Sequence, residues 1–189
     1  MASGRAVLHS TVAPMSLPDL VEHSETVVIG QVVGLAAVGS GTMPGLDLKV
    51  PFTDVRIAVD EYITRDLKMS EVNVRTLGGI AEDDGFDVPD EPRFTPGERV
   101  VVFMSKDTGN LFELPDDTFT VEGLTRGKYS VIHEDNRDVA IAAQDHSTVE
   151  LKNLLETIHG ATHGIAAFGD QLNTSASGDQ LDTMGDASV

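Results

Sequence analysis

The stretch TVVIGQVVGLAAVG, residues 26–39, decides the fold. It could be a membrane anchor, a helix or a buried strand, and each of these implies a different fold. Its first half is rich in β-branched residues, which favour a pleated strand over a helix. Gly30 and Gly34 would each weaken a helix. The apolar run is also far shorter than the roughly 20 residues of a membrane-spanning helix. We therefore expect no membrane span but a central strand, apolar on both faces at its start, with a bulge or bend at Gly30.

A flexible turn is expected at residues 39–45, and a second strand at residues 52–63, where apolar and polar side chains alternate. At Pro96-Gly97 we expect a type II turn, with glycine at the position that needs a positive φ. Further strands are predicted at residues 71–79, 96–105 (after this turn), 110–114, 118–123, 127–132 and 138–143.

Two helices flank the predicted strands. A short helix over residues 17–23 follows an N-cap at Ser16. A longer helix is predicted over residues 146–160, where Ser147 and Glu150 form a capping box. Its final glycine suits the position just after a helix end.

These elements indicate a mainly β fold, a small antiparallel, partly open barrel of the oligonucleotide/oligosaccharide-binding (OB) type with a short N-terminal helix and a C-terminal helix. This domain covers residues 16–159 and follows a flexible segment at residues 1–15. Residues 160–189 contain no Lys or Arg, so we expect an acidic, low-complexity, disordered tail. The alternative is an immunoglobulin-like β-sandwich, although no Cys-Trp-Cys pattern supports it.

The chain is strongly acidic, because 31 Asp and Glu residues outnumber 13 Lys and Arg residues and give a formal net charge of −18. Such a surface repels phosphate backbones, so we expect no nucleic-acid partner. The composition also fits a halophilic protein that stays soluble at high salt. The absence of Cys excludes disulfides, thiolate metal sites and a cysteine nucleophile.

Several motifs occur in a familiar order over residues 16–132: SLPDLV, VVIGQV, TDVRIAVDEYI, VNVRTLGG, FTPGERVVVFM and GKYSV. In this layout the chain resembles a largely uncharacterised family of exported bacterial and archaeal domains, similar in turn to netrin-like domains and tissue inhibitors of metalloproteinases. The resemblance implies an OB barrel and an extracellular or cell-surface location. No secretion signal is legible, so this location presumes that a leader was removed, and the alternative is cytoplasmic. Those inhibitors act through an N-terminal Cys, so their mechanism does not transfer.

An acidic loop over residues 81–92 is the candidate metal site. Its carboxylates could supply the several oxygen ligands that Ca²⁺ takes from a flexible loop, although their spacing does not match an EF-hand. The alternative is an ordinary solvated loop in an acidic protein. The candidate ligands are Glu82, Asp83, Asp84, Asp87 and Asp90.

Other patterns favour structural roles. His159 and His163 have the spacing of two metal ligands on a helix, but Gly160 argues that the helix ends between them. His133 is expected in an exposed turn. Four rings could form a stacking platform for bases or sugars, but such rings are more often core. They are Phe103, Phe112, Phe119 and Tyr129.

Two stretches contain the residue types of a hydrolase. Ser130 lies near Lys128, and Asp145, His146 and Ser147 are adjacent. The three adjacent residues cannot converge in triad geometry, and Ser147 is already predicted to serve as a helix cap, so a serine hydrolase is disfavoured.

We therefore expect a non-enzymatic binding or assembly domain, with a protein partner or with itself, whose tail is a spacer or pairs with a neighbour's open sheet edge. The alternatives are a Ca²⁺-dependent glycan- or protein-binding module and, less favoured, a cytoplasmic ligand-binding protein or a hydrolase. Apart from Ca²⁺, no cofactor is expected.

Overall fold

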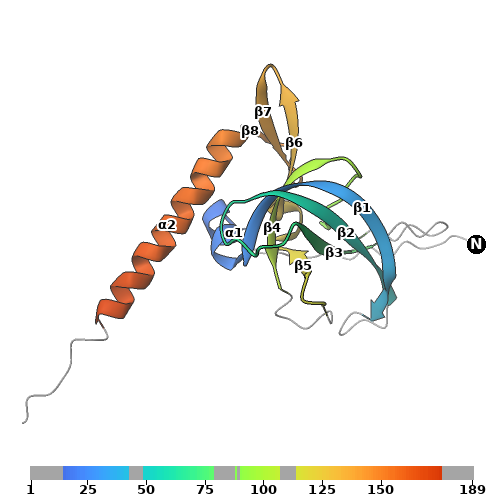
Figure 1. The fold of residues 1–189 in the computed structure, drawn as a ribbon, viewed down its shortest axis with the longest axis horizontal. Helices are drawn as coiled ribbons and strands as arrows, with labels where there is room; N and C mark the ends of the chain where they lie inside the picture. The colour runs from blue at the N-terminus through green and yellow to red at the C-terminus, as the bar shows by residue number, and fades with distance from the viewer. Residues whose placement is uncertain (1–14, 43–48, 79–87, 89, 107–113, 176–189) are drawn as a thin grey trace, which may run out of the picture.

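The computed structural model describes residues 15–42, 49–78, 88, 90–106 and 114–175, with the backbone alone for residues 164–175. The helical elements are α1 (Leu17–His23), the 3-10 helix η1 (Leu124–Gly127) and α2 (Leu151–Ser175). The strands are β1 (Thr26–Thr42), β2 (Lys49–Tyr62), β3 (Glu71–Leu77), β4 (Arg99–Ser105), β5 (Thr118–Val121), β6 (Lys128–Glu134), β7 (Arg137–Ala142) and β8 (Thr148–Glu150). A long, curved β1–β2 hairpin forms one side of the molecule, and α2 runs along the opposite side (Figure 1).

The strands form a single sheet with the order β1-β2-β3-β5-β4-β6-β7-β8, in which β1 also pairs with β4. Five strands, β1-β2-β3-β5-β4, therefore close partly into a ring, which confirms the mainly β, partly open OB-like fold with a helix at each end. One continuous sheet does not provide the two facing sheets of the alternative sandwich. β3 and β5 run parallel, so the barrel is not purely antiparallel as predicted.

The ring is irregular where β5 joins it. β5 shares two residue pairs with β3 and two with β4: Asn73–Thr118, Val74–Phe119, Met104–Val121 and Ser105–Thr120. Lys106 reinforces this junction, because its Nζ donates to the carbonyl oxygens of Pro115, Asp116 and Thr118. The same Nζ lies 3.9 Å from the centroid of the Phe119 ring.

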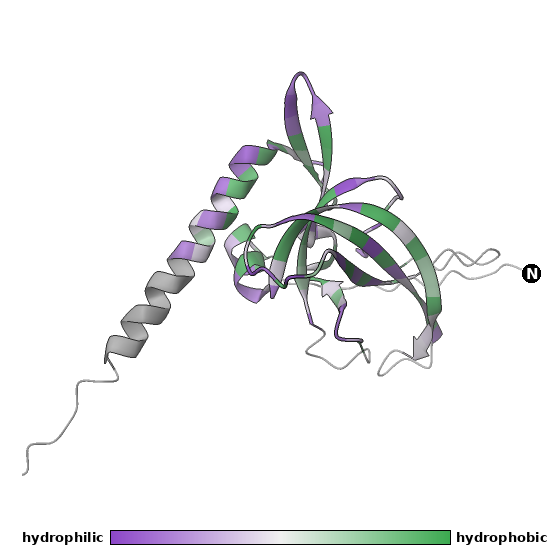
Figure 2. Ribbon diagram, viewed as in Figure 1, coloured by the Kyte–Doolittle hydropathy of each residue, from purple (hydrophilic) through white to green (hydrophobic). Residues whose placement is uncertain are grey.

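Two hydrophobic cores explain why β1 and β4 are apolar on both faces. Val28 and Val102 belong to the core inside the barrel, whereas their neighbours Val27 and Val101 belong to the core between the sheet and the two helices. Each of these side chains is fully buried. The predicted central position of both strands is thus confirmed. The hydropathy colouring shows the green stretches of the barrel strands (Figure 2).

Gly30 and Gly97 occupy the conformations that the sequence predicts. The β1–β2 register shifts immediately before Gly30, which confirms the bulge or bend there. A Cβ at this position would lie 2.3 Å from the Ala58 carbonyl oxygen. Gly97 has a φ of +85°, and the Glu98 N–H donates to the Thr95 carbonyl at 3.0 Å, which closes the predicted turn.

The C-terminal helix differs from the prediction at both ends. Residues 148–150 form β8, paired with β7, and α2 begins only at Leu151. Pairing with β7 therefore prevails over the predicted capping box at Ser147. The backbone of α2 continues through Gly160 to Ser175, so the predicted helix end at Gly160 is wrong.

Some predicted segments lie outside the described residues. They are residues 1–14 of the N-terminal segment, residues 110–113 of one strand and residues 176–189 of the tail. Among the helices in the described ranges, none is both long enough and apolar enough to cross a membrane.

Candidate functional site

One edge of β1 has no partner strand over its second half in the described part of the chain. Pairing with β4 runs from Thr26 to Gln31, and backbone hydrogen bonds of Val32 with the turn before β4 are the last contacts on that side. Pairing with β2 on the other side continues to Thr42. We call the backbone of residues 33–42 on the side away from β2 the open β1 edge.

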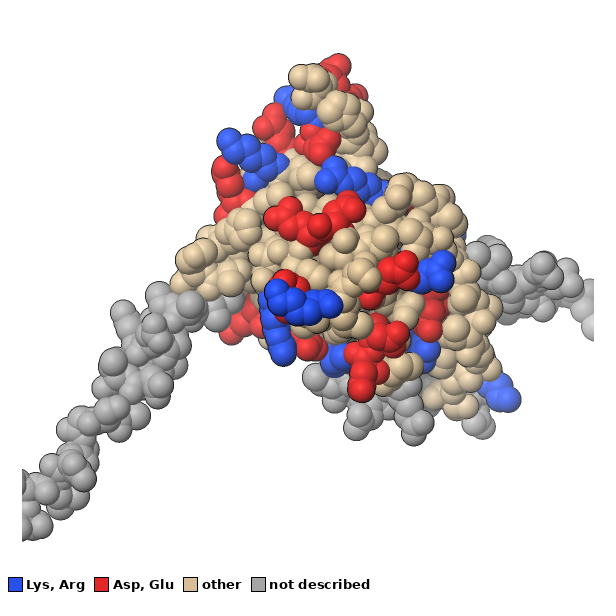
Figure 3. All heavy atoms as spheres, in the orientation of Figure 1, with Lys and Arg blue, Asp and Glu red and all other residues tan. Residues whose placement is uncertain are grey.

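The open β1 edge is apolar and uncharged. Its sequence is VGLAAVGSGT, and the side chains of Val33 and Val38 are 39% and 43% exposed. Among the large apolar side chains of the described ranges, only Ile132 is comparably exposed, at 42%. The surface over β1, at the right of the space-filling view, is mostly tan (Figure 3). An exposed apolar strand with unpaired backbone groups is a template for another strand.

The carboxylates of Asp54 and Glu71 beside the open β1 edge are paired on β2 and β3. Asp54, the ladder partner of Ala36, accepts hydrogen bonds of 2.7 and 2.9 Å from Arg75. Both side chains of this pair are mostly buried. Arg56 lies 3.7 Å from Glu71. Lys49, at the start of β2, is exposed and adds a positive charge. The sheet next to the edge therefore carries no excess of carboxylates in a molecule that is acidic as a whole.

The other end of the sheet is protected. β8 is only three residues long, and its Glu150 accepts a 2.9 Å hydrogen bond from Arg137 on β7. Short edge strands with charged side chains resist strand addition. Of the two ends of the sheet, the open β1 edge is thus the one suited to binding a strand.

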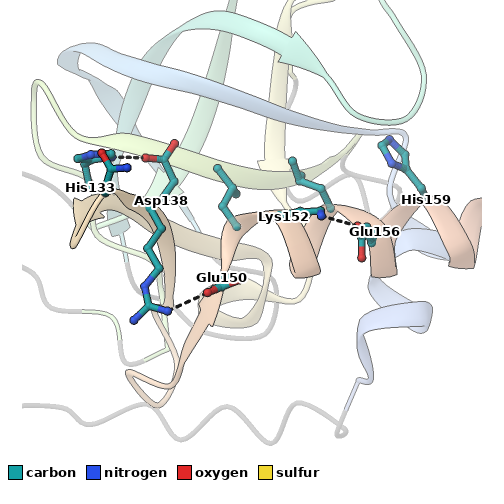
Figure 4. Close-up of a pocket in the computed structure, with 10 residues that line it drawn as sticks. His133, Asp138, Glu150, Lys152, Glu156 and His159 are labelled. Atoms are coloured by element: carbon teal, nitrogen blue, oxygen red, sulfur yellow. Dashed lines mark hydrogen bonds and ion pairs between the residues drawn. The ribbon is translucent and has the colours of Figure 1, made fainter.

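A groove of about 580 Å³ lies between the β6–β7 hairpin and the start of α2 (Figure 4). Leu151 and Leu155 contribute its apolar surface. Its polar groups bond to one another: Arg137 pairs with Glu150, Lys152 pairs with Glu156, and the His133 ring is hydrogen-bonded to Asp138. Hydrogen bonds from His133, the larger cause, and from Arg99 hold the pKa of Asp138 below its ordinary value. Because the charges are satisfied locally, the groove favours neither an anion nor a cation.

Lys128 and Ser130, two residues apart on β6, are in contact in a polar cluster. The Lys128 Nζ donates to Oε1 of Glu98 at 2.6 Å, to the Arg93 carbonyl at 2.8 Å and to Oγ of Ser130 at 3.2 Å. It also lies 5.1 Å from the centroid of the Phe94 ring. An ammonium committed to three acceptors is not available as a general base, so this cluster favours a structural role.

Most of the predicted Ca²⁺ site lies outside the described residues, so it stays a prediction. The four ligands concerned are Glu82, Asp83, Asp84 and Asp87. The fifth, Asp90, is exposed with a φ of +67°, and its carbonyl accepts a 3.0 Å hydrogen bond from the Thr125 N–H. The described residues contain no group of three or more His, Cys, Asp or Glu side chains placed to hold a metal.

The histidines have ordinary structural roles, as the sequence favours, although the helix does not end between His159 and His163. His159 and His163 lie on one continuous helix with exposed side chains, and Nδ1 of His163 is 2.7 Å from the His159 carbonyl oxygen. His133 belongs to β6 and is exposed, although not in the turn that was predicted. The turn is instead made by Asp135 and Asn136, which both have a positive φ.

The Asp145-His146-Ser147 stretch forms a local turn rather than a triad. The Ser147 N–H donates to Oδ1 of Asp145 at 3.0 Å, and hydrogen bonds from Ser147 lower the pKa of this carboxyl. His146 has a φ of +60°. The carboxylate therefore bonds to Ser147 and not to an imidazole.

The favoured interpretation of the aromatic rings as core residues is confirmed for the two phenylalanines of this set that the structure describes. Phe103 and Phe119 are almost fully buried and belong to different cores. Tyr129 packs against Phe103 with ring centroids 6.3 Å apart. Phe112 lies outside the described residues.

No protein-family model matches this chain, and no curated protein matches it. Sequence reasoning expected an open sheet edge but missed its place on β1, because the sequence predicts a turn from residue 39 whereas β1 continues to Thr42. The signal that could have found it is the run from residue 26 to residue 46, which contains no charged side chain.

Proposed function

We propose that this chain is a non-enzymatic binding or assembly domain that accepts an extended polypeptide strand at the open β1 edge. Strand addition is a common mode of peptide recognition, in which backbone hydrogen bonds supply affinity. We place the domain at the cell surface or outside the cell, and the resemblance to exported bacterial and archaeal domains supports this location.

One observation carries the proposal. β1 leaves its β4 partner at Gln31 but stays paired with β2 for the rest of its length, so the β1–β2 hairpin holds an extended strand in place without a neighbour on one side. The strand is therefore already ordered, which lowers the entropic cost of binding. Its exposed valines offer apolar contacts for alternate side chains of an incoming peptide.

A fluorescent peptide tests strand binding directly. The probe is a ten-residue peptide of alternating Val and Thr with a Lys at each end for solubility, and the readout is fluorescence anisotropy. Titrations use about 1 M NaCl, where the Debye length falls to ~3 Å and attraction to the acidic surface is screened. We expect saturable binding by the full chain.

The Val38→Lys variant, matched with Ile132→Lys, identifies the site. Both positions are exposed to a similar degree, and both changes add one positive charge. A lysine on an edge strand opposes strand addition, so we expect Val38→Lys to weaken peptide binding about tenfold or more, while Ile132→Lys binds as the parent chain does. Equal affinity of all three proteins, or no binding at all, contradicts the proposal.

A further inference from the structure

We infer that the strand bound at the open β1 edge is the same edge of a second copy of this chain, so that two molecules pair antiparallel across a twofold axis. This inference rests on the proposed function and names its partner.

Charge favours a second copy at this place. The chain carries a net charge of −18, so two copies repel each other over most approaches. The run from residue 26 to residue 46 has no charged side chain, and the nearest carboxylates on β2 and β3, those of Asp54 and Glu71, are paired with arginines. The open β1 edge is thus a place where two copies can meet without bringing unpaired carboxylates together.

The backbone geometry suits pairing of identical strands. Register shifts fall between Val32 and Gly34 and between Ala37 and Gly39, but residues 34–37 keep regular pairing with β2. In a regular antiparallel strand, alternate residues direct both N–H and C=O toward the same edge. A twofold axis near Ala36 would therefore let each copy satisfy the groups of the other, as isologous contacts do.

The position of β4 supports the same arrangement. β4 runs antiparallel to β1, and the pairing between them stops at the turn around Gly97, just before β4 begins. A second β1 would continue the sheet on the side that β4 vacates, in the same antiparallel sense. Pairing would also cover the exposed side chains of Val33 and Val38, which flank the regular segment.

The molar mass of the full chain in solution tests the inference. Light scattering after size exclusion is measured over a range of protein concentrations, and we expect a mass that approaches twice 20.1 kDa. We expect the dimer to strengthen as salt screens the repulsion between the acidic surfaces. Val38→Lys should remain a monomer, whereas the matched Ile132→Lys should dimerise like the parent. A dimer that Val38→Lys does not disturb overturns the inference.

A single cysteine locates the contact. The chain contains no Cys, so Ala36→Cys and Ala37→Cys each introduce a unique thiol. Directly opposed residues on antiparallel strands have Cβ atoms about 4.5–5.5 Å apart, so a short bifunctional maleimide should join two copies at one or both positions. Ile132→Cys is the control and should not cross-link above background. Cross-linking that is equal at all three positions counts against twofold pairing.

The two proposals fail separately. A chain that stays monomeric at every concentration, yet binds the valine-threonine peptide in a Val38-dependent way, refutes self-pairing and keeps strand binding. A chain that does neither refutes both.

Discussion

The ammonium of Lys128 and the carboxylate of Glu98 form an ion pair of 2.6 Å between the start of β6 and the turn that precedes β4. The two side chains are only 5% and 17% exposed. Lys128 also donates to the Arg93 carbonyl, and the Ser130 hydroxyl donates to the same Glu98 oxygen. This cluster therefore ties the turn that ends the β1–β4 pairing to β6.

Lys128→Met should strongly destabilise the domain. Removal of one partner leaves the Glu98 carboxylate poorly solvated, which typically costs about 3–5 kcal/mol for a buried pair. Urea unfolding of the full chain measures the loss. The double variant Lys128→Met/Glu98→Met should recover part of the stability, because no unpaired charge remains. If the double variant instead loses further stability relative to Lys128→Met, the unpaired Glu98 charge is not the cause of the destabilisation.

Glu91 should make stability fall as pH rises. Partial burial raises the pKa of its carboxyl from 4.5 to about 7, and a hydrogen bond from the Leu77 N–H opposes the rise only in part. The folded chain thus holds this proton more tightly than the unfolded chain. The contribution of Glu91 to the free energy of unfolding is fully present below pH 4.5, is lost as the pH rises to about 7, and changes no further above that value. The full difference is at most about 3 kcal/mol.

Glu91→Gln checks this effect, since glutamine still accepts the Leu77 hydrogen bond but does not titrate. The free energy of unfolding is measured for both proteins from pH 4 to 8, and the parent should lose stability relative to the variant across this window. The difference between the two curves removes the contribution of the other carboxyls. A difference that is constant with pH contradicts the assignment.

Gly160→Ala should stabilise the protein. Gly160 lies inside α2, and a Cβ there would meet no atom within 4 Å. Alanine in a helix interior is favoured over glycine by about 0.5–1 kcal/mol. The melting temperature measures the gain, and Gly97→Ala is a contrasting control that should lose stability, because its φ of +85° disfavours any side chain. A loss at Gly160 would instead mean that the helix ends there.

Lys106→Met should loosen β5 locally. The variant removes donors to three carbonyl groups and the cation next to the Phe119 ring. Since two of these carbonyls are exposed and can bind water, we expect a global loss of only about 1–2 kcal/mol. Hydrogen exchange should quicken for the β5 amides and stay unchanged in the β6–β7 hairpin. Uniform acceleration over the whole chain would show that the effect is not local.

The sequence predicts the strands well where local pattern and burial agree. Val28 and Val102 could be assigned to central strands because apolar residues stand on both faces, and two cores explain them. The capping box at Ser147 misled the prediction, because pairing of β8 with β7 outweighs a local cap. Gly160 misled it as well, since packing of Leu154 and Ile158 holds the helix past a weak helix former.

The open β1 edge is harder to predict from the sequence, because its position depends on where β1 stops pairing with β4. The spacing of Lys128 and Ser130 on one strand indicated their proximity, but no local signal marked Glu98 as the partner. Similarly, the uncharged run after residue 26 is visible in the sequence. Whether β4 pairs with all of β1 or only with its first half depends on the tertiary structure.

The parallel junction of β3 and β5 has a consequence for how the barrel forms and opens. Only two residue pairs, beginning with Asn73 and Thr118, join these strands, which are far apart in the chain, so the ladder gains little free energy when they meet. This junction should close last in folding and separate first in the native state, while the hairpins stay intact. Solvent and small apolar molecules would then reach the aliphatic interior beside Phe119 through a transient gap in the wall, without global unfolding.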